Sequence, residues 1–275
     1  MDKYLICIDL DSTFLKDDKT ISDRAKEYVR RLTEAGHLFV INTGRPHQGA
    51  IEFLKELNIH TPIVGNNGSI IAYYNQDYTK LESYHTFDLD IEIVKEFYSE
   101  VKAYLNTCAI TSALDFYSSD MEKCPFFVIH KNEQITFHEG DISSLLITTP
   151  IHAEFYIKHE YLEEFINVLH KEKYQNHFDY IHWGEWDNIN SFEMFSKNAS
   201  KGKAMEFLAK KYGINPKNTI SFGDQLNDIS MIEYSYDGVA MDNARHDVKL
   251  IANHITKKDN NDDGVVSYLE ELNLI

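Results

Sequence analysis

The sequence has few cysteines, a shortage of positive charge and no long apolar run. Its three cysteines, Cys7, Cys108 and Cys124, form no C-x-x-C pair, which excludes a disulfide framework and favours a reducing compartment. No run approaches the roughly 20 apolar residues that a membrane-spanning helix needs. The start of the chain lacks the basic segment and the longer apolar region of a signal peptide. We therefore expect a cytoplasmic protein with no membrane partner.

Acidic residues outnumber basic ones by 44 to 27, which gives a net charge of −17. This balance argues against nucleic acid as a partner, because a polyanion is held by a basic surface. An anionic substrate would need a local positive site. The 13 histidines form neither H-E-x-x-H nor a Cys/His spacing, so we expect no dedicated transition-metal site.

At 275 residues the chain is long enough for a core domain and a second unit. Continuous apolar runs alternate with amphipathic stretches near both ends, a pattern typical of a parallel sheet covered by helices. Strands are expected at residues 4–8, 37–42, 62–65, 219–222 and 238–241, and helices at 22–35, 47–57, 201–212, 227–234, 244–252 and 265–272.

The middle of the chain has a different texture. Aromatic residues and histidines become frequent there, and a helix is expected over 160–173. Alternating strands are expected at 126–130, 153–158, 178–183 and 189–195. Such alternation suits an antiparallel sheet with one face covered by helices. We therefore predict an α/β fold, in which a Rossmann-like parallel-sheet core of residues 1–82 and 196–275 carries an inserted α+β unit of residues 83–195.

Two carboxylates, Asp9 and Asp11, directly follow the first strand. The run before them reads as a buried parallel strand, so both lie at its carboxyl end, where open α/β sheets bind their ligands. Two acids this close repel each other, and keeping both ionised requires a cation or a shared proton. A hard divalent metal such as Mg²⁺ is the simplest solution.

Polar side chains also follow other strands of the same sheet. Thr43 ends the second strand, Asp224 and Asp228 follow the strand at 219–222, and Lys201 begins a helix. Because strand ends of a doubly wound sheet meet in one crevice, we expect these groups to converge. Asp224 and Asp228 are four residues apart, so they would share one side of a first helical turn if a helix begins there.

Four short motifs follow one another in a fixed order along the chain. They are Asp9-Leu10-Asp11-Ser12-Thr13-Phe14-Leu15, Asn42-Thr43-Gly44-Arg45-Pro46, Ser200-Lys201-Gly202 and Gly223-Asp224-Gln225-Leu226-Asn227-Asp228. Together they resemble the haloacid dehalogenase (HAD) superfamily, in particular its Cof-type hydrolases with a C2B cap (subfamily IIB). The resemblance covers nearly the whole chain. Ser12 stands where the family usually has Gly, and Phe14 where it usually has Leu; Ser12 narrows the freedom of the turn, since Gly tolerates a positive φ.

This resemblance implies a Mg²⁺-dependent phosphatase whose inserted unit is a C2B-type cap. Asp9 would attack the substrate phosphorus and form an aspartyl-phosphate. Asp11 would protonate the leaving oxygen and then deprotonate the hydrolytic water. Asp9, the backbone carbonyl of Asp11 and Asp224 would hold the metal.

The resemblance also implies a phosphate site. Thr43 and Lys201 would stabilise charge on the equatorial oxygens of the phosphoryl group, with Asn227 and Arg45 as further phosphate contacts. Asp228 would orient a metal-bound water or Lys201. Alone, each residue has an ordinary explanation: Thr43 as a helix N-cap before Pro46, for example. The prediction therefore depends on the set.

The function predicted from these residues is hydrolysis of small phosphorylated metabolites, such as sugar phosphates or phosphorylated cofactors, since a cap excludes water and macromolecules. Two alternatives remain open: a phosphomutase, and a regulator that binds phosphosugars without turnover. Trp183 and Trp186 flank Gly184-Glu185 in a possible hairpin tip, where they could contact the leaving group or serve as ordinary core or surface aromatics. The sequence leaves the substrate and the oligomeric state undetermined.

A second metal motif is also present near the end of the chain. Residues Asp259 to Glu270 satisfy the EF-hand pattern D-x-[DN]-x-[DN]-G-x5-E. The segment before it reads as a strand end rather than an entering helix, and no paired second loop is found. Calcium binding at this loop is therefore left open.

Overall fold

The computed structural model describes residues 2–125 and 135–275, and the chain divides into two compact units. The first, called the core, comprises Met1–His85 and Ser200–Ile275, and the second, called the cap, comprises Thr86–Ala199. The boundaries lie three and four residues beyond the expected ones at 82 and 195. The strand expected at 126–130 lies outside the described residues.

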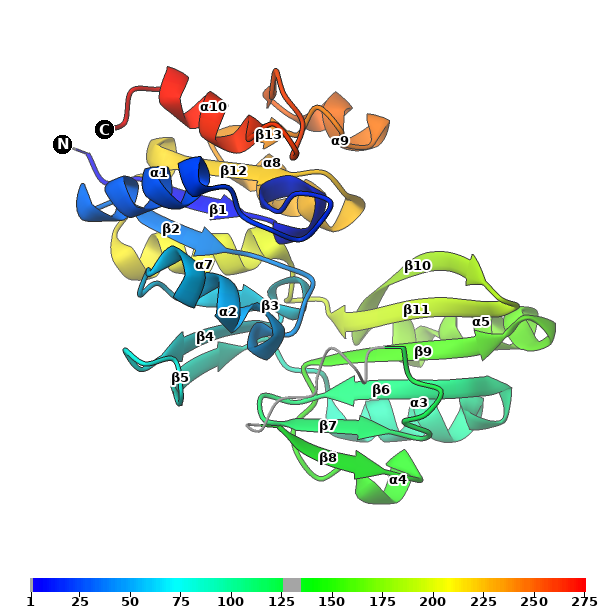
Figure 1. Ribbon diagram of the computed structural model, residues 1–275. Helices are drawn as coiled ribbons and strands as arrows, with labels where there is room; N and C mark the ends of the chain where they lie inside the picture. Colours follow the sequence, from blue (N-terminus) through cyan, green and yellow to red (C-terminus); the bar gives the residue numbers. More distant parts are fainter. Residues whose placement is uncertain (1, 126–134) are drawn as a thin grey trace. The chain divides into compact units, whose positions relative to one another are not determined.

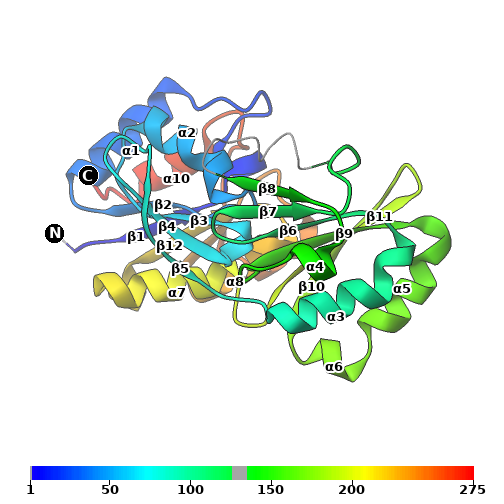
Figure 2. The same cartoon turned by 90° about the horizontal axis from the view of Figure 1, so that it is seen from below.

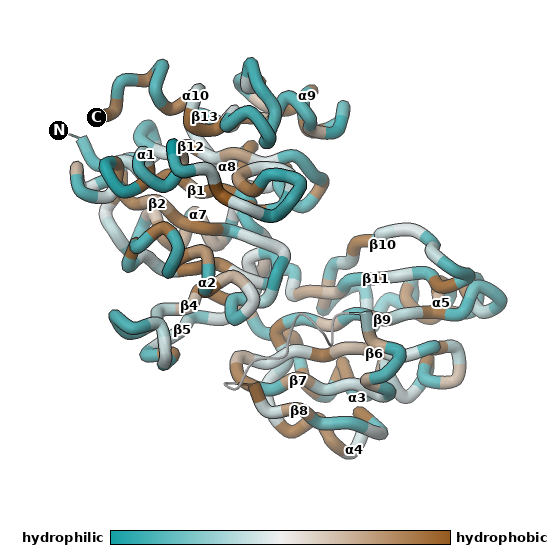
Figure 3. The backbone as a smooth tube through the Cα atoms, viewed as in Figure 1, coloured by the Kyte–Doolittle hydropathy of each residue, from teal (hydrophilic) through white to brown (hydrophobic). Residues whose placement is uncertain are grey.

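The core is built on five parallel strands in the order β14-β13-β12-β1-β2 (Figure 1). They are β1 Leu5–Ile8, β2 Leu38–Ile41, β12 Thr219–Gly223, β13 Asp237–Ala240 and β14 His254–Ile255. Every residue of β1 is buried, because β1 lies between two strands and helices cover both faces of the sheet. Strands buried on both faces are continuously apolar, and Figure 3 shows β1 and β2 as hydrophobic segments.

A small three-stranded sheet continues the core beyond its edge strand β2. It contains β3 Ile63–Gly65, β4 Ile70–Tyr74 and β5 Leu81–Thr86. A parallel bridge between Asn42 and Val64 connects β3 to the end of β2. The turn Asn66–Gly68 joins β3 to β4 and returns the chain antiparallel.

The helices of the core begin and end where local chemistry dictates. They are α1 Asp23–Glu34, α2 His47–Leu57, α7 Lys201–Tyr212, α8 Ile229–Tyr234, α9 His246–Ile251 and α10 Gly264–Glu271. Helix α7 begins after Ser200, whose side chain accepts a hydrogen bond from the Lys203 amide, and ends at Gly213 in the left-handed conformation. In Figure 2, α1, α2 and α10 lie on one face of the sheet and α7 and α8 on the other. The predicted α/β core is confirmed.

The cap is a six-stranded sheet in the order β10-β11-β9-β6-β7-β8. Its strands are β6 Leu105–Thr111, β7 Asp115–Ser118, β8 Thr136–Glu139, β9 His152–Lys158, β10 Phe178–Trp186 and β11 Ile189–Ser196. Neighbours pair antiparallel, as expected, except β7 and β8, which are parallel. Helices α3 Ile91–Val101, α4 Ile142–Leu145, α5 Leu162–Leu169 and α6 Glu172–Gln175 gather on one face (Figure 2).

The single helix expected over 160–173 is wrong, because the structure divides it. Helix α5 ends at Leu169, Lys171 is extended with ψ of 135°, and α6 follows. The break allows Tyr174 to turn into the core of the cap, where its ring meets Phe97 edge to face at 4.9 Å between centroids. Burial of a large aromatic side chain here outweighs continuous helical hydrogen bonding. Among the described helices, none is both long enough and apolar enough to cross a membrane.

Candidate active site

Asp9 lies at the carboxyl end of β1 and is 6% exposed. The chain then makes a tight turn over Leu10–Phe14, within which Ser12 adopts φ of 59°, in the left-handed region. A side chain with a Cβ occupies that region at a cost of about 1–2 kcal/mol. The turn brings Thr13 back toward the neighbouring strand end, where its hydroxyl donates to Asp224 Oδ1 over 2.9 Å.

Lys201 is the central cation of the site and is completely buried. Its Nζ donates to Asp9 Oδ1 over 2.5 Å and to Asp228 Oδ1 over 2.6 Å. Burial opposes the charge on Lys201, but the neighbouring Asp228 and Asp9 carboxylates outweigh it and raise the pKa of this lysine. Lys201 is therefore held as an ammonium ion between Asp9, at the end of β1, and Asp228, in the turn before α8.

The backbone around Lys201 is fixed by close packing. The Asn42 side-chain amide donates to the Lys201 carbonyl over 2.9 Å. Gly68, at φ of 94°, lies so near the start of α7 that a Cβ there would be 2.2 Å from the Ser200 carbonyl oxygen. Only glycine permits both the positive φ and this approach, so the turn Asn66–Gly68 positions the amino end of α7.

Asp224 and Asp228 would share a helical turn only if a helix began at Asp224, and the helical residues begin after it. A short turn over Leu226–Asp228 precedes α8, and Asp224 lies before its cap residue, Gln225. Asp228 Oδ2 instead accepts hydrogen bonds from the Asp224 and Gln225 amides, at 2.9 and 3.0 Å. This capping arrangement, and not the helical period, brings the two acids together.

Asp9, Asp224 and Asp228 form a buried cluster whose carboxylate oxygens lie within 4.8 Å of one another. Burial raises the pKa of Asp224 to about 6, with a further contribution from the Asp228 charge. Burial likewise raises the pKa of Asp9, although Lys201 partly opposes this shift. One ammonium ion cannot neutralise three acids, so the cluster has the charge deficit and the hard oxygen donors that suit a divalent cation such as Mg²⁺.

The carboxylate of Asp11 lies outside this cluster and has its own partners. Arg45 donates two hydrogen bonds of 2.6 Å to this carboxylate, from Nε and Nη2, and Lys19 Nζ donates a third at 2.7 Å. Partial burial would raise the pKa of Asp11, but these cations lower it to about 2. Arg45, expected as a phosphate contact, therefore binds Asp11 in this structure, and its guanidinium also lies 5.2 Å from the Phe53 ring centre.

Thr43, Gly44 and Asn227 lie close together around Asn67, whose backbone amide donates to the Thr43 carbonyl over 3.1 Å. Thr43 is buried, and its hydroxyl accepts from the Arg45 amide over 3.1 Å. It does not cap α2, whose cap residue is Pro46. Asn227 donates to Asn67 Oδ1 over 2.7 Å, and a Cβ on Gly44 would lie 3.0 Å from that same oxygen. Hydroxyl, amide and backbone groups of the kind that hold a phosphate therefore gather around Asn67.

Four residues that shape this site were not among those predicted from the sequence: Thr13, Lys19, Asn42 and Asn67. Thr13 and Asn42 stand inside the quoted motifs, so their positions were visible although their contacts were not. The consecutive Asn66, Asn67 and Gly68, all with positive φ, carried a turn signal in the sequence. Lys19 carried none, because it reaches Asp11 from a loop.

The EF-hand-like segment is not arranged as a calcium loop. Strand β14 precedes it in place of an entering helix. Glu270, which would be the bidentate ligand, pairs with Arg24 Nη2 at 2.6 Å, and Asp263 Oδ1 accepts from the Ser22 hydroxyl. Asn261 binds Asp17. These residues fasten both ends of α10 and the loop before it to the first turn of α1 and the loop that precedes it.

The fold and this geometry define an α/β protein with a buried acid–lysine cluster beside the ends of parallel strands. A family model described as haloacid dehalogenase-like hydrolase matches residues 6–269, and the chain belongs to this family. The resemblance inferred from the four motifs is thereby confirmed, and with it the enzyme class.

The chain is similar to known proteins over nearly its whole length. It is 30% identical to the 5-amino-6-(5-phospho-D-ribitylamino)uracil phosphatase YitU of Bacillus subtilis, covering 98% of this chain and 97% of that protein. It is 28% identical to the pyridoxal phosphate phosphatase YbhA of Escherichia coli, covering 98% of each. The fold matches the crystal structure of a haloacid dehalogenase-like hydrolase from Bacteroides thetaiotaomicron with a TM-score of 0.77 at 23% identity, over 98% of this chain and 100% of that one.

Proposed function

We propose that the protein is a Mg²⁺-dependent phosphomonoesterase that hydrolyses small phosphorylated metabolites through an aspartyl-phosphate on Asp9. The observation that supports it most directly is the buried contact of Lys201 with both Asp9 and Asp228, beside Asp224. A site this acidic and this enclosed is costly to build unless a cation and an anionic substrate complete it.

Asp9 is the nucleophile of the proposed reaction. Lys201 binds Asp9 Oδ1, so Oδ2 is the oxygen that attacks the phosphorus. The P–O bond to the leaving group breaks as the bond to Asp9 forms. Water then attacks the phosphorus of the aspartyl-phosphate, which releases inorganic phosphate and restores the Asp9 carboxylate.

Asp11 carries the proton in both steps. It donates a proton to the leaving oxygen in the first step and removes one from water in the second. In this structure, Arg45 and Lys19 hold Asp11 ionised. A bound phosphoryl group competes for these two cations, and losing them raises the pKa of Asp11 toward the range in which it can donate.

Charge on the phosphoryl oxygens is stabilised from several sides. Asp9, Asp224 and the Asp11 carbonyl would hold Mg²⁺, which supplies Lewis-acid stabilisation of the transferring group when bound. Thr43 and Asn227, which lie near each other beside Gly44, would donate to the phosphate, and Lys201 would provide a fixed positive charge. Asp228 keeps Lys201 in place.

The proposed substrates are small phosphorylated metabolites of the kind specified by the names of the two relatives. The test is phosphate release from p-nitrophenyl phosphate and from a panel of phosphorylated sugars and cofactors, with Mg²⁺ and with EDTA. We expect Mg²⁺-dependent turnover that Asp9→Asn abolishes. No phosphate release from any substrate, or full turnover by Asp9→Asn, would contradict the proposal. In oxygen-18-labelled water, incorporation of the label into the released phosphate distinguishes hydrolysis from phosphoryl transfer to a second hydroxyl.

A further inference from the structure

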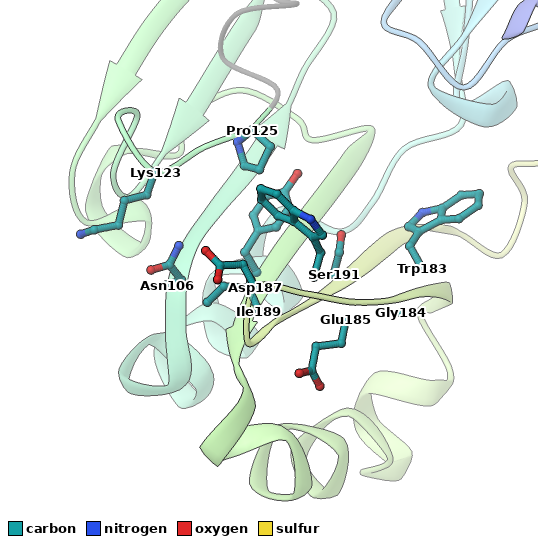
Figure 4. A pocket seen from close by; sticks show the side chains of 11 residues that line it. Asn106, Lys123, Pro125, Trp183, Gly184, Glu185, Asp187, Ile189 and Ser191 are labelled. Atoms are coloured by element: carbon teal, nitrogen blue, oxygen red, sulfur yellow. The ribbon is translucent and has the colours of Figure 1, made fainter. Parts of the chain in front are cut away.

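The cap contains a cleft of about 360 Å³ at the tip of the β10–β11 hairpin, a volume in the range of small-molecule sites. All of its lining residues belong to the cap. Figure 4 shows Asn106 and Lys123 on one side of it, Trp183 on the other, and Glu185 directed away from it. The chain has two tryptophans, Trp183 and Trp186, and both line this cleft.

A β-bulge places both tryptophans on the same face of the sheet. In a regular strand, residues three apart point to opposite faces. In β10, however, His182 pairs with Phe192 and Gly184 with Ser191, so Trp183 is the extra, unpaired residue. Gly184 follows at φ of 101°. Bulges of this kind redirect side chains and are frequent beside functional sites.

The neighbours across the strands identify which face this is. Trp186 pairs with Ile189, and Ser191 of β11 pairs with Tyr156 of β9. Phe155 and Phe192, the sequence neighbours of Tyr156 and Ser191, pack on the opposite side of the sheet, against Phe165 of α5. The two indoles, Tyr156 and Ser191 therefore share the face that the cap's helices do not cover.

The orientation of Trp183 is fixed from beneath by a buried charge. Its indole N–H donates to Glu193 Oε2 over 2.8 Å, although 45% of the tryptophan is exposed. Glu193 is 3% exposed, and its Oε1 binds His152 Nε2 at 2.9 Å. A hydrogen-bonded carboxylate and histidine are expensive to bury. This pair preorganises an aromatic surface that would otherwise rotate in solvent.

The rim of the cleft disfavours anions. Asp187 and Asn188 turn the hairpin, both with positive φ as in a type I′ turn, and Asp187 presents its carboxylate beside the cleft. Lys123 pairs with Asp120. Asn106 and Ser191 add neutral hydrogen-bonding groups.

From this geometry we propose that the hairpin cleft of the cap is a binding site for an uncharged ring that has an apolar face and hydrogen-bond donors at its edge. A sugar ring and an amino-substituted heterocycle both have this chemistry. The ring stacks on the two indoles while Asp187 and Asn106 accept from its edge. The proposal concerns the cap by itself and goes beyond the proposed function.

The two indole N–H groups give a direct readout, because the chain has two tryptophans and both are in the cleft. The ¹⁵N-labelled full chain is titrated with D-glucose and, separately, with cytosine, and the indole resonances are followed by NMR. We expect a saturable shift with at least one of these two rings. The ring that produces it shows whether the cleft binds a sugar or an amino-substituted heterocycle. Glycerol, which has no ring, and orotate, a ring with a carboxylate, should give none.

Variants test whether the ring binds in the cleft or elsewhere on the molecule. Trp186 is 82% exposed, so Trp186→Ala folds normally and should weaken ring binding roughly tenfold, about 1.4 kcal/mol, with Trp183 as the remaining reporter. Glu193→Gln keeps an acceptor for Trp183 and should bind within about threefold of the native chain. Tyr180→Ala, at an aromatic residue of the same strand that is absent from the cleft lining, is the matched control and should bind normally.

No shift with either ring, equal shifts with glycerol or orotate, or unchanged affinity in Trp186→Ala would overturn the proposal. Because none of these titrations requires turnover, they are decided independently of the phosphatase assay.

Discussion

Arg45 holds the Asp11 carboxylate in a bidentate ion pair, with Nε–Oδ2 and Nη2–Oδ1 distances that are both 2.6 Å. The second motif of the chain is thereby attached to the first. The pair keeps the proposed proton carrier ionised and places the cation that a phosphate would attract next to it.

Replacing Arg45 with Met should raise the pKa of Asp11 from about 2 toward the ordinary aspartate value of 3.8, with Lys19 holding it somewhat below that value. Carbon-13 NMR titration of the side-chain carboxyls measures this shift. Because its pKa is lowered in the folded chain, ionised Asp11 stabilises the fold at pH values above about 3.8, and this contribution is lost as the pH falls toward 2. Asp11 is partly exposed, so we expect the loss to be about 1 kcal/mol or less.

The same variant should reduce kcat/KM at least tenfold, about 1.4 kcal/mol, because the substrate phosphate loses a cation. Arg24→Met, which removes the ion pair with Glu270, is the control and should leave activity unchanged. Equal activity in the two variants would argue against a role for Arg45 at the site.

Lys201→Met should abolish turnover and destabilise the fold by about 3–5 kcal/mol, since it leaves Asp9 and Asp228 buried without their shared cation. Thermal unfolding and phosphate release measure the two effects. Lys203→Met, on the exposed face of the same helix, should change stability by less than about 0.5 kcal/mol. A native melting temperature for Lys201→Met would contradict the bridging role.

Magnesium should stabilise the protein more at about pH 7.5 than at about pH 5. The pKa values of Asp224, at about 6, and of Asp9 are raised in the folded chain. Without metal, the folded state thus favours the protonated acids, and its stability falls as pH rises from about 4 through the raised pKa values. Melting temperatures in Mg²⁺ and in EDTA at both pH values provide the measurement, and Asp224→Asn should remove most of the Mg²⁺ effect. The same increment at both pH values would count against metal binding by these acids.

Ser12→Gly should stabilise the protein. The left-handed conformation of Ser12 costs about 1–2 kcal/mol, and the added freedom of Gly in the unfolded chain offsets about 0.4–1 kcal/mol of the gain. A net gain near 1 kcal/mol is expected in denaturant unfolding. Ser12→Ala retains the strain and is the control. If the Gly variant is no more stable than the Ala variant, Ser12 is not strained.

The core could be predicted from the sequence because its signals are local. Helix α7 has the bounds Lys201–Tyr212 in both the prediction and the structure, since Ser200 begins it and Gly213 ends it. The cap was harder to predict. The break at Lys171 depends on packing of Tyr174 against Phe97, and the bulge at Trp183 depends on pairing with β11, so neither has a local signal.

The site divides in the same way. Residues that follow strands, such as Asp9, Thr43 and Asp224, could be proposed for the site because the fold brings strand ends together. The partners of Asp11 were not predictable, because Lys19 and Arg45 reach it from loops whose course depends on tertiary contacts. The capping contact from Asp228 to the Asp224 amide likewise replaced the helical spacing that the sequence suggested.

The proposed mechanism depends above all on covalent phosphorylation of Asp9. Rapid acid quench during turnover, followed by borohydride reduction and peptide mass spectrometry, converts an acyl phosphate to homoserine at the modified residue. The mechanism predicts homoserine at position 9 in the native enzyme and its absence in Asp9→Asn. Phosphate release without homoserine at position 9, or homoserine at another acid such as Asp224, would contradict it.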